Sequence, residues 1–230
     1  ISFTQAADNS TTAGDIRFAW TGEVNEQAHA YTPGSTPEAG DVWLNYNADW
    51  SEGFGKGTYA YSVLIHELGH ALGLKHTFEG GASLPSGEDG YHNSVMSYTA
   101  YPGYADSMVN FNPTTPMLYD IAAIQYLYGA NTSYNAGNNT YTFQQGQNYF
   151  QTIWDGGGKD TIVWQGSTQS ATIDLRPGAW SDLGNSLQFY NFDWSPATTS
   201  TWTVAIAFAV TIENATGGGA GDQLTGNNAA

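Results

Sequence analysis

The sequence HELGHALGLKH, residues 66–76, restricts the fold of this chain more than any other feature. His66 and His70 are four residues apart, so on a helix their rings lie on one face, about one turn from each other. His76 follows six residues later and could not reach the same point from a continuous helix. Gly73 resolves this, because glycine readily adopts a positive φ and ends a helix. The sequence therefore predicts a helix that ends near Gly73 and a chain that turns back to bring three histidines together.

Three converging imidazoles predict a tetrahedral zinc site whose fourth position is open to water, as in catalytic zinc centres. The chain has no cysteine, which excludes thiolate sites and disulfides. Glu67 follows the first histidine and is expected to lie beside the metal, where its carboxylate could take a proton from water. A short HExxH pattern could arise by chance on a buried helix face. The longer HExxHxxGxxH pattern, which also fixes a third histidine and a glycine, favours the zinc site.

Charge and composition exclude some classes of partner. The 5 Lys and Arg stand against 21 Asp and Glu, which gives a formal net charge of −16. Nucleic acid and anionic membrane surfaces are therefore poor partners, whereas cations are good ones. A hydrophobic content of 40% favours a folded globular protein, and no stretch approaches the length of a membrane span. Without disulfides, a secreted protein needs another stabilising link, for which bound calcium is a candidate.

The first part of the chain combines predicted strands with one helix. Short apolar runs separated by turns predict strands at ISFTQ, DIRFAW and DVWLNYN. From about Thr58 the apolar spacing becomes helical, and residues 77–112 are loop-like.

A second helix is predicted over TPMLYDIAAIQYLYG, with Thr115 as its N-cap, Pro116 in its first turn and Gly129 after its last turn. Beyond Gly129 the composition shifts to Gly, Asn, Asp and Thr, and strand-like runs such as TIVW and ATIDL alternate with turns. We therefore predict an α+β catalytic domain over residues 1–130 and an all-β segment over residues 131–230.

The motif and its surroundings resemble the metzincin clan of zinc endopeptidases. That clan has a tight methionine-containing turn beneath the zinc, and SVMSY, residues 94–98, looks like it, with Met96 as the apolar floor. Tyr98 narrows the resemblance to serralysins and astacins, in which this phenol stabilises the oxyanion. Astacins depend on disulfides, so the cysteine-free chain is more similar to serralysins. PMLYDIAAIQYLYGAN and TIENATGG also resemble serralysin segments, and the similarity spans about Ile1 to Asn227.

The resemblance implies a twisted, mostly parallel sheet with an antiparallel edge strand, a zinc helix and a C-terminal helix. A truncated calcium-binding β-roll is expected to follow. Serralysins place a strand and a long helix ahead of a segment like ISFTQ, and they end with several β-roll turns. Both are missing here, so we expect a fragment whose exposed sheet face is covered by a companion polypeptide or by some other compensation.

Two calcium sites are implied in the all-β segment. WDGGGKDTI, residues 154–162, offers two carboxylates separated by glycines, whose flexibility lets backbone carbonyls face a hard cation. By resemblance, one ion would use Asn135, Gly137, Asn139, Asp155, Gly157 and Asp160. A second would use Gly158, Asp160, Thr211 and Glu213. An ordinary Gly-Asp turn is the alternative for each. The terminal GGGAGDQLTGN supplies one turn of a glycine- and aspartate-rich repeat, so no ion is expected there.

The activity implied is broad hydrolysis of peptide bonds in extracellular proteins by a secreted enzyme. His66, His70 and His76 would hold the zinc, Glu67 would act as general base, and Tyr98 would stabilise the oxyanion. An extended substrate is expected to pair with an edge strand formed by Val42, Trp43, Leu44 and Asn45. His29 and His92 are expected to have no metal role. The alternatives are a relative with a silent zinc site and a calcium-dependent structural or adhesive β module.

Overall fold

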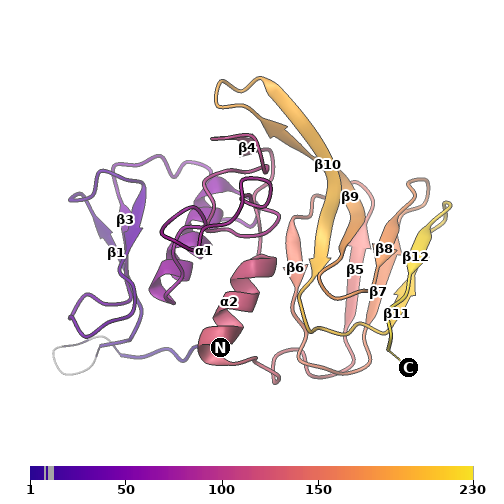
Figure 1. Ribbon diagram of the computed structural model, residues 1–230, viewed down its shortest axis with the longest axis horizontal. Coiled ribbons are helices and arrows are strands. Elements are labelled where there is room, and N and C mark those ends of the chain that lie inside the picture. Colours follow the sequence, from indigo (N-terminus) through magenta and orange to yellow (C-terminus); the bar gives the residue numbers. More distant parts are fainter. Residues whose placement is uncertain (8, 10–12, 230) are drawn as a thin grey trace.

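A computed structural model of the protein describes residues 1–7, 9 and 13–229. Two helices stand in the middle of the molecule, between a small sheet and a larger all-β half (Figure 1). The coarse prediction of mixed sheets with few helices is confirmed by this arrangement.

The small sheet contains three strands in the order β1-β3-β2. Its members are β1 (Arg17–Thr21), β2 (Ala28–Ala30) and β3 (Asp41–Asn45). β1 and β3 run parallel, and β2 is antiparallel to β3. DIRFAW and DVWLNYN therefore form strands as predicted, and the sheet is mixed.

The prediction that DVWLNYN forms an edge strand is wrong. β3 is hydrogen-bonded to β1 on one side and to β2 on the other, so its backbone groups are already used. The proposed substrate-binding edge strand, made of Val42, Trp43, Leu44 and Asn45, is thus the central strand of its sheet. The antiparallel edge strand is β2, which is only three residues long and has a weaker signal in the sequence.

Helix α1 (Tyr59–Ala71) has the predicted beginning and end. The Thr58 side chain accepts a hydrogen bond from the Tyr61 N–H and caps the first turn. At the other end Gly73 has a φ of 95°, and its N–H donates to the carbonyl of His70. The N–H of Leu74 donates to the carbonyl of Gly69, which completes a Schellman motif and reverses the chain.

Helix α2 (Leu118–Tyr128) ends before Gly129, as predicted, but begins later than expected. Thr115 is not its N-cap, because the Thr115 hydroxyl accepts a hydrogen bond from the N–H of Thr152 in a neighbouring strand. The helix starts after Met117 instead, and the carboxylate of Asp120 accepts the Met117 N–H. The Thr115 hydroxyl thus bonds to a distant strand and does not cap the helix.

The segment ISFTQ is not a strand in the structure. Ile1 and Phe3 line a hollow together with Leu68 of α1 and Ile121 of α2, and the Ile1 carbonyl accepts a hydrogen bond from the Asn131 side chain. The segment therefore lies beside the helices without strand pairing, and Phe3 is 63% exposed.

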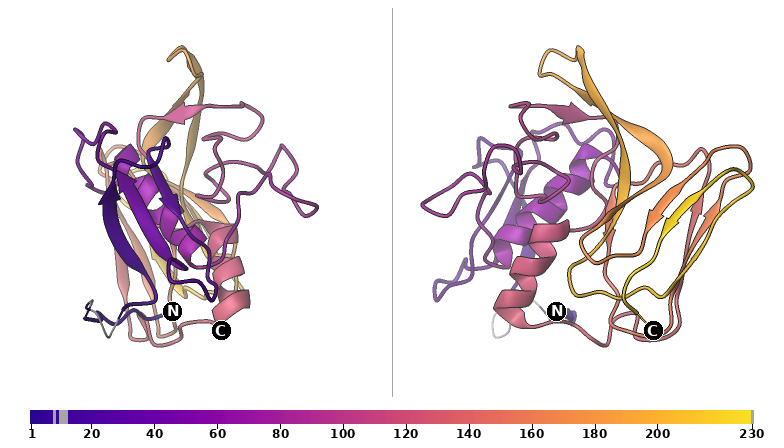
Figure 2. Two further views of the ribbon diagram at one scale, coloured as in Figure 1. Left: turned by 90° about the vertical axis from the view of Figure 1, so that its left-hand side faces the viewer. Right: turned by 45° about the vertical axis from the view of Figure 1, so that its right-hand side comes forward.

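The all-β half is built largely from parallel strands. One sheet contains β5 (Thr140–Gln144), β7 (Thr161–Gln165) and β11 (Asn214–Thr216), all parallel. The other contains β6 (Gln151–Ile153), β8 (Thr172–Asp174), β9 (Trp180–Tyr190), β10 (Pro196–Ile206) and β12 (Gln223–Thr225). β9 and β10 form a long antiparallel hairpin that extends above the rest of the molecule (Figure 2).

The two halves share a hydrophobic core. Short strand β4 (Met108–Val109) pairs with the far end of β9. One buried cluster combines Met96 and Met117 with Leu187 and Phe189 of β9. The loops beneath the histidines are therefore supported by residues from both sides of position 130.

Candidate metal centre

The structure brings His66, His70 and His76 together. One ring nitrogen of each lies within 4.8 Å of those of the other two. Helix α1 supplies His66 and His70, whose ring centroids are 4.8 Å apart, and the turn at Gly73 delivers His76. The Nε2 atoms of His70 and His76 are 3.0 Å apart. The prediction that a broken helix makes the three rings converge is confirmed.

Hydrogen bonds to the outer nitrogens show that this cluster fits a metal ion. The Nδ1 atoms of His66 and His70 lie 2.7 and 2.9 Å from the carbonyl oxygens of Val95 and Leu74. Because a carbonyl only accepts, each Nδ1 carries the proton and each Nε2 presents a lone pair. Nε2 lone pairs that face one another repel unless a cation lies between them.

The protonation of these rings also suits a cation. Burial lowers the pKa of His66 to about 4, and burial lowers the pKa of His70 as well. Both rings are therefore neutral at pH 7, which is the form that binds a metal. The Nδ1 atom of His76 lies 2.6 Å from a carboxylate oxygen of Glu79, in place of a backbone carbonyl. Glu79 was not identified from the sequence, where an acid three residues after a histidine in a loop has no distinctive signal.

Glu67 lies on α1 beside the first histidine and is 7% exposed. Its buried Oε2 has no hydrogen-bond partner among the residues that the structure describes. Desolvation by burial raises the pKa of its carboxyl to about 7, and the charge of Glu26 adds to the shift. A carboxyl with this pKa can exchange a proton near neutral pH.

Two aromatic rings flank the histidines on the open side. Tyr98 is 57% exposed, and its ring centroid is 4.6 Å from that of His76 and 5.7 Å from that of His66. Phe78 stacks on His76 at 5.0 Å and also contacts Tyr98 at 5.1 Å. Tyr98 thus lies where a phenol could reach a ligand, whereas Phe78 was missed in the sequence because it belongs to a loop without periodicity.

Met96 lies under the helix as an apolar floor. It is 1% exposed and belongs to the cluster that also contains Leu74 and Met117. It approaches α1 at Gly69, where an added Cβ would be 2.4 Å from the Met96 sulfur. The glycine between the two helical histidines is therefore required by close packing.

Outward-facing backbone groups are present on strand β2. The N–H of Asn45 donates to the Gln27 carbonyl, and the N–H of Tyr31 donates to the Asp41 carbonyl. Since backbone groups alternate sides along a strand, those of Ala28 and Ala30 face away from β3. β2 is the last strand of its sheet in the described part of the chain, so these groups are placed to pair with an added strand.

Several oxygens of the first predicted calcium site lie together. The end of the Asn139 amide is 2.6 Å from the Gly137 carbonyl oxygen and 2.9 Å from that of Asn135. Either the amide NH₂ donates to both carbonyls, or the amide oxygen joins them around a cation. Nearby, the Asp155 carboxylate accepts hydrogen bonds from the Tyr141 hydroxyl at 2.5 Å and from the Gly157 N–H at 2.7 Å.

Asp160 lies between the two predicted calcium sites and is fully buried. Its Oδ1 accepts the Asn139 N–H, but its Oδ2 has no hydrogen-bond partner among the described residues. Its own N–H donates to the Glu213 carboxylate at 2.7 Å. Burial raises the pKa of Asp160, and the negative charges of Asp155 and Glu213 raise it further. The oxygen of Asp160 that has no hydrogen-bond partner could serve as a ligand of a hard cation.

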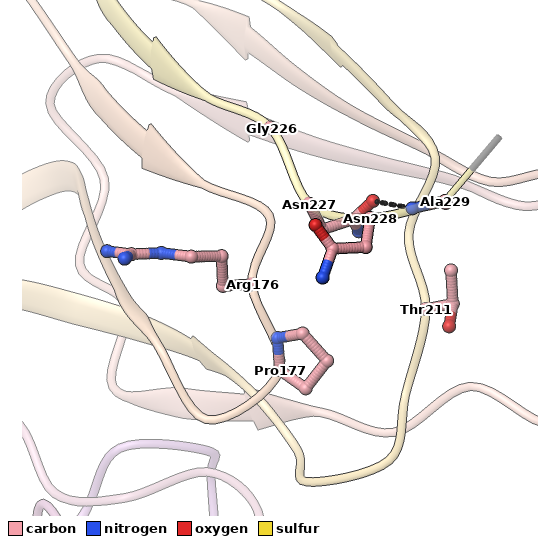
Figure 3. A pocket seen from close by; sticks show the side chains of 7 residues that line it. All are labelled: Arg176, Pro177, Thr211, Gly226, Asn227, Asn228 and Ala229. Carbon is pink, nitrogen blue, oxygen red and sulfur yellow. Dashed lines mark hydrogen bonds between the residues drawn. The ribbon is translucent and has the colours of Figure 1, made fainter.

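The remaining predicted calcium ligands differ in how well the structure supports them. Gly158 has a φ of 145°, and an added Cβ would be 2.2 Å from the Gly137 oxygen, so only glycine fits between the two loops. Thr211 lines a separate hollow, opposite Arg176 and Pro177 (Figure 3).

Comparison with known proteins shows family similarity along the whole chain. Residues 1–86 match the Matrixin family of peptidase M10, and residues 56–148 match a Met-zincin family. Residues 119–230 match the peptidase M10 serralysin C-terminal family. The first match contains the three histidines, and the last contains the all-β half.

Individual relatives agree with these families. Serralysin A of Dickeya chrysanthemi is 36% identical over 217 residues, which cover 88% of this chain and 43% of the relative. Metallopeptidase AprA of Pseudomonas marginalis is 32% identical over an alignment of 260 positions, which covers 100% of this chain and 51% of the relative. The chain thus spans about half the length of these relatives. No helix in the described part of the chain is long and apolar enough to cross a membrane.

Proposed function

Because the chain is a serralysin-type metzincin, we propose that it is a zinc-dependent endopeptidase that hydrolyses peptide bonds of extracellular proteins with broad specificity. The observation that carries the proposal is the convergence of His66, His70 and His76. The buried carboxyl of Glu67, the residue that follows His66 on the same helix, supplies a candidate base. Zinc held by these imidazoles would polarise the substrate carbonyl and make water more acidic.

The residues around the histidines have separate roles in the proposed reaction. The Glu67 carboxylate accepts a proton from the attacking water and returns it to the leaving amine. Its raised pKa, about 7, suits both transfers near neutral pH. The Tyr98 hydroxyl donates a hydrogen bond to the carbonyl oxygen as that atom gains negative charge. Met96 holds the floor beneath the site without touching substrate.

The substrate is proposed to lie along β2 rather than β3. Main-chain pairing with Ala28 and Ala30 would read the backbone of the substrate, which accounts for broad specificity. Peptide substrates that are N-methylated at single amides test this arrangement without altering the enzyme. Methylation of an amide that pairs with β2 should lower kcat/KM by about 10-fold, and methylation of the next amide should not. Equal effects at successive amides would refute pairing with β2.

Calcium is the second proposed cofactor. One ion would be held by Asp155 and Asp160 with loop carbonyls of the glycine-rich segment, and a second by Asp160 and Glu213. Bound calcium would link β5, β7 and β11 in a chain that has no disulfide. We also propose that the protein acts outside the cell, that a companion polypeptide is a further partner, and that nucleic acid and membranes are not partners. Two large apolar side chains of β1, Phe18 and Trp20, support such a companion polypeptide, because they lie on one face of the sheet and are exposed.

The decisive experiment replaces Glu67 with Gln, which keeps the size of the side chain but cannot take up the proton. Casein hydrolysis should fall by at least about 1,000-fold, while one zinc per chain remains bound. Glu38→Gln is the matched control, because Glu38 is a half-buried glutamate in the loop before β3, outside the site. Retained activity in Glu67→Gln would refute the role of Glu67. Absence of bound zinc in the unaltered protein would refute the proposed function.

A further inference from the structure

A buried carboxylate lies behind the first zinc-binding histidine without touching it. Asp120 of α2 is 2% exposed, and its two oxygens accept three hydrogen bonds, none of them from a basic side chain. Two of the donors are the Ser94 hydroxyl, at 2.5 Å, and the Val95 N–H, at 2.8 Å. Both belong to the turn that contains Met96. The third donor, the Met117 N–H, is the start of α2 itself.

A continuous chain of hydrogen bonds connects this carboxylate with His66. The Ser94 hydroxyl donates to Asp120, and the Ser94 oxygen accepts the Met96 N–H at 3.0 Å. That N–H belongs to the same peptide group as the Val95 carbonyl, which accepts the His66 Nδ1–H at 2.7 Å. Every link thus points its donor toward the carboxylate, and hydrogen bonds arranged in this way strengthen one another.

We propose that Ser94 and Asp120 are positioning residues that act on His66 through the Val95–Met96 peptide group. The negative charge of Asp120 polarises the hydroxyl and then the peptide, so the Val95 carbonyl becomes a better acceptor for the Nδ1 proton. His66 is held in one tautomer and one ring orientation, and its Nε2 becomes a stronger metal ligand. Asp120 thus orients the His66 ring indirectly, whereas the Glu79 carboxylate contacts the Nδ1 atom of His76 directly.

Burial of the relay supports this assignment over a simple capping role. Ser94 is 2% exposed, and the carboxyl of Asp120 has a pKa raised to about 6 by desolvation, which its three donors only partly offset. A buried carboxylate costs stability, and a cap for α2 alone could be supplied by an exposed Ser or Asp. At neutral pH the group is ionised and able to polarise its donors.

The test compares Ser94→Ala with Ser97→Ala. Ser97 is equally buried in the same turn, but its hydroxyl bonds to Thr99 and lies outside the relay. Zinc affinity is measured by competition with a chromophoric chelator, and the His66 Nδ1–H resonance is measured by NMR after zinc removal. Ser94→Ala should weaken zinc binding by about 10-fold or more and shift the resonance upfield. Ser97→Ala should leave zinc affinity within about 2-fold.

The outcomes separate this inference from the proposed function on which it rests. Equal zinc affinity and an equal His66 resonance in the two alanine variants would overturn the relay. If Ser94→Ala does not fold, Ser94→Cys, with a weak S–H donor in the same place, takes its position in the comparison. The zinc affinity of Ser94→Cys should then lie between that of the unaltered protein and the roughly 10-fold weaker affinity expected for Ser94→Ala. A zinc affinity and a His66 resonance equal to those of the unaltered protein would overturn the relay. Zinc stoichiometry of the unaltered protein tests the proposed function separately, and the resonance reports on His66 whether or not zinc binds.

Discussion

Replacement of Gly69 by Ala should have two opposing effects on the free energy of unfolding, and one of them depends on Met96. Alanine is the better helix former, which should stabilise the interior of α1 by about 1 kcal/mol. The new Cβ would lie 2.4 Å from the Met96 sulfur, and Met96 has little room to move because it is 1% exposed. Overpacking of a core costs about 1–3 kcal/mol. The single variant should therefore be less stable than the unaltered protein by up to about 2 kcal/mol.

A double-mutant cycle isolates the clash from the helix propensity. Met96→Ala alone should cost about 2–5 kcal/mol, because it leaves a cavity beneath the histidines. In that background the sulfur is absent, so Gly69→Ala should stabilise the protein by about 1 kcal/mol. The sign of the Gly69→Ala effect thus reverses, and the coupling energy should be about 1–3 kcal/mol.

Urea unfolding, monitored by tryptophan fluorescence in excess calcium with zinc chelated, measures all four free energies. Zinc is removed so that the readout reports packing rather than metal binding. If Gly69→Ala has the same effect on stability with and without Met96, the close approach between helix and turn does not constrain this position, and the reasoning fails.

Two further predictions concern titratable groups outside the metal centre. Burial lowers the pKa of His92 to about 4, whereas the ordinary value is 6.5. The unfolded chain therefore binds more protons between these values, and His92 should contribute stability above pH 6.5 that is lost as the pH falls through 4, up to roughly 3 kcal/mol. His92→Gln should flatten the dependence of Tm on pH over this range, and an unchanged slope would contradict the assignment. Asp160→Asn should raise Tm by a few degrees when calcium is chelated, because it relieves repulsion from Asp155 and Glu213. In excess calcium the same change should lower Tm, since a ligand is lost; a shift of the same sign under both conditions would argue against calcium binding there.

Local signals in the sequence predicted the parts of the site that depend on neighbours along the chain. The histidine spacing requires one helix face, and Gly73 adopts the positive φ that ends the helix. The same helix begins directly after Thr58, where the apolar spacing becomes helical. Each of these features follows from backbone geometry within a few residues, which is why a single sequence was sufficient.

Features that depend on contacts between distant segments were misjudged or missed. DVWLNYN has the same alternation whether it lies at the centre or at the edge of a sheet, and only pairing with β1 and β2 makes it central. Thr115 looks like a helix cap, but Thr152 competes for its hydroxyl.

The sequence by itself determined that three histidines would meet at the end of a helix, because helical periodicity and the conformational freedom of glycine act locally. The tertiary structure alone decided what surrounds them. The carboxylate of Asp120 reaches His66 through Ser94 and one peptide group only because α2 packs beneath the Met96 turn. Hydrogen bonds of this kind depend on segments that are 26 residues apart, and no periodicity in the chain encodes them.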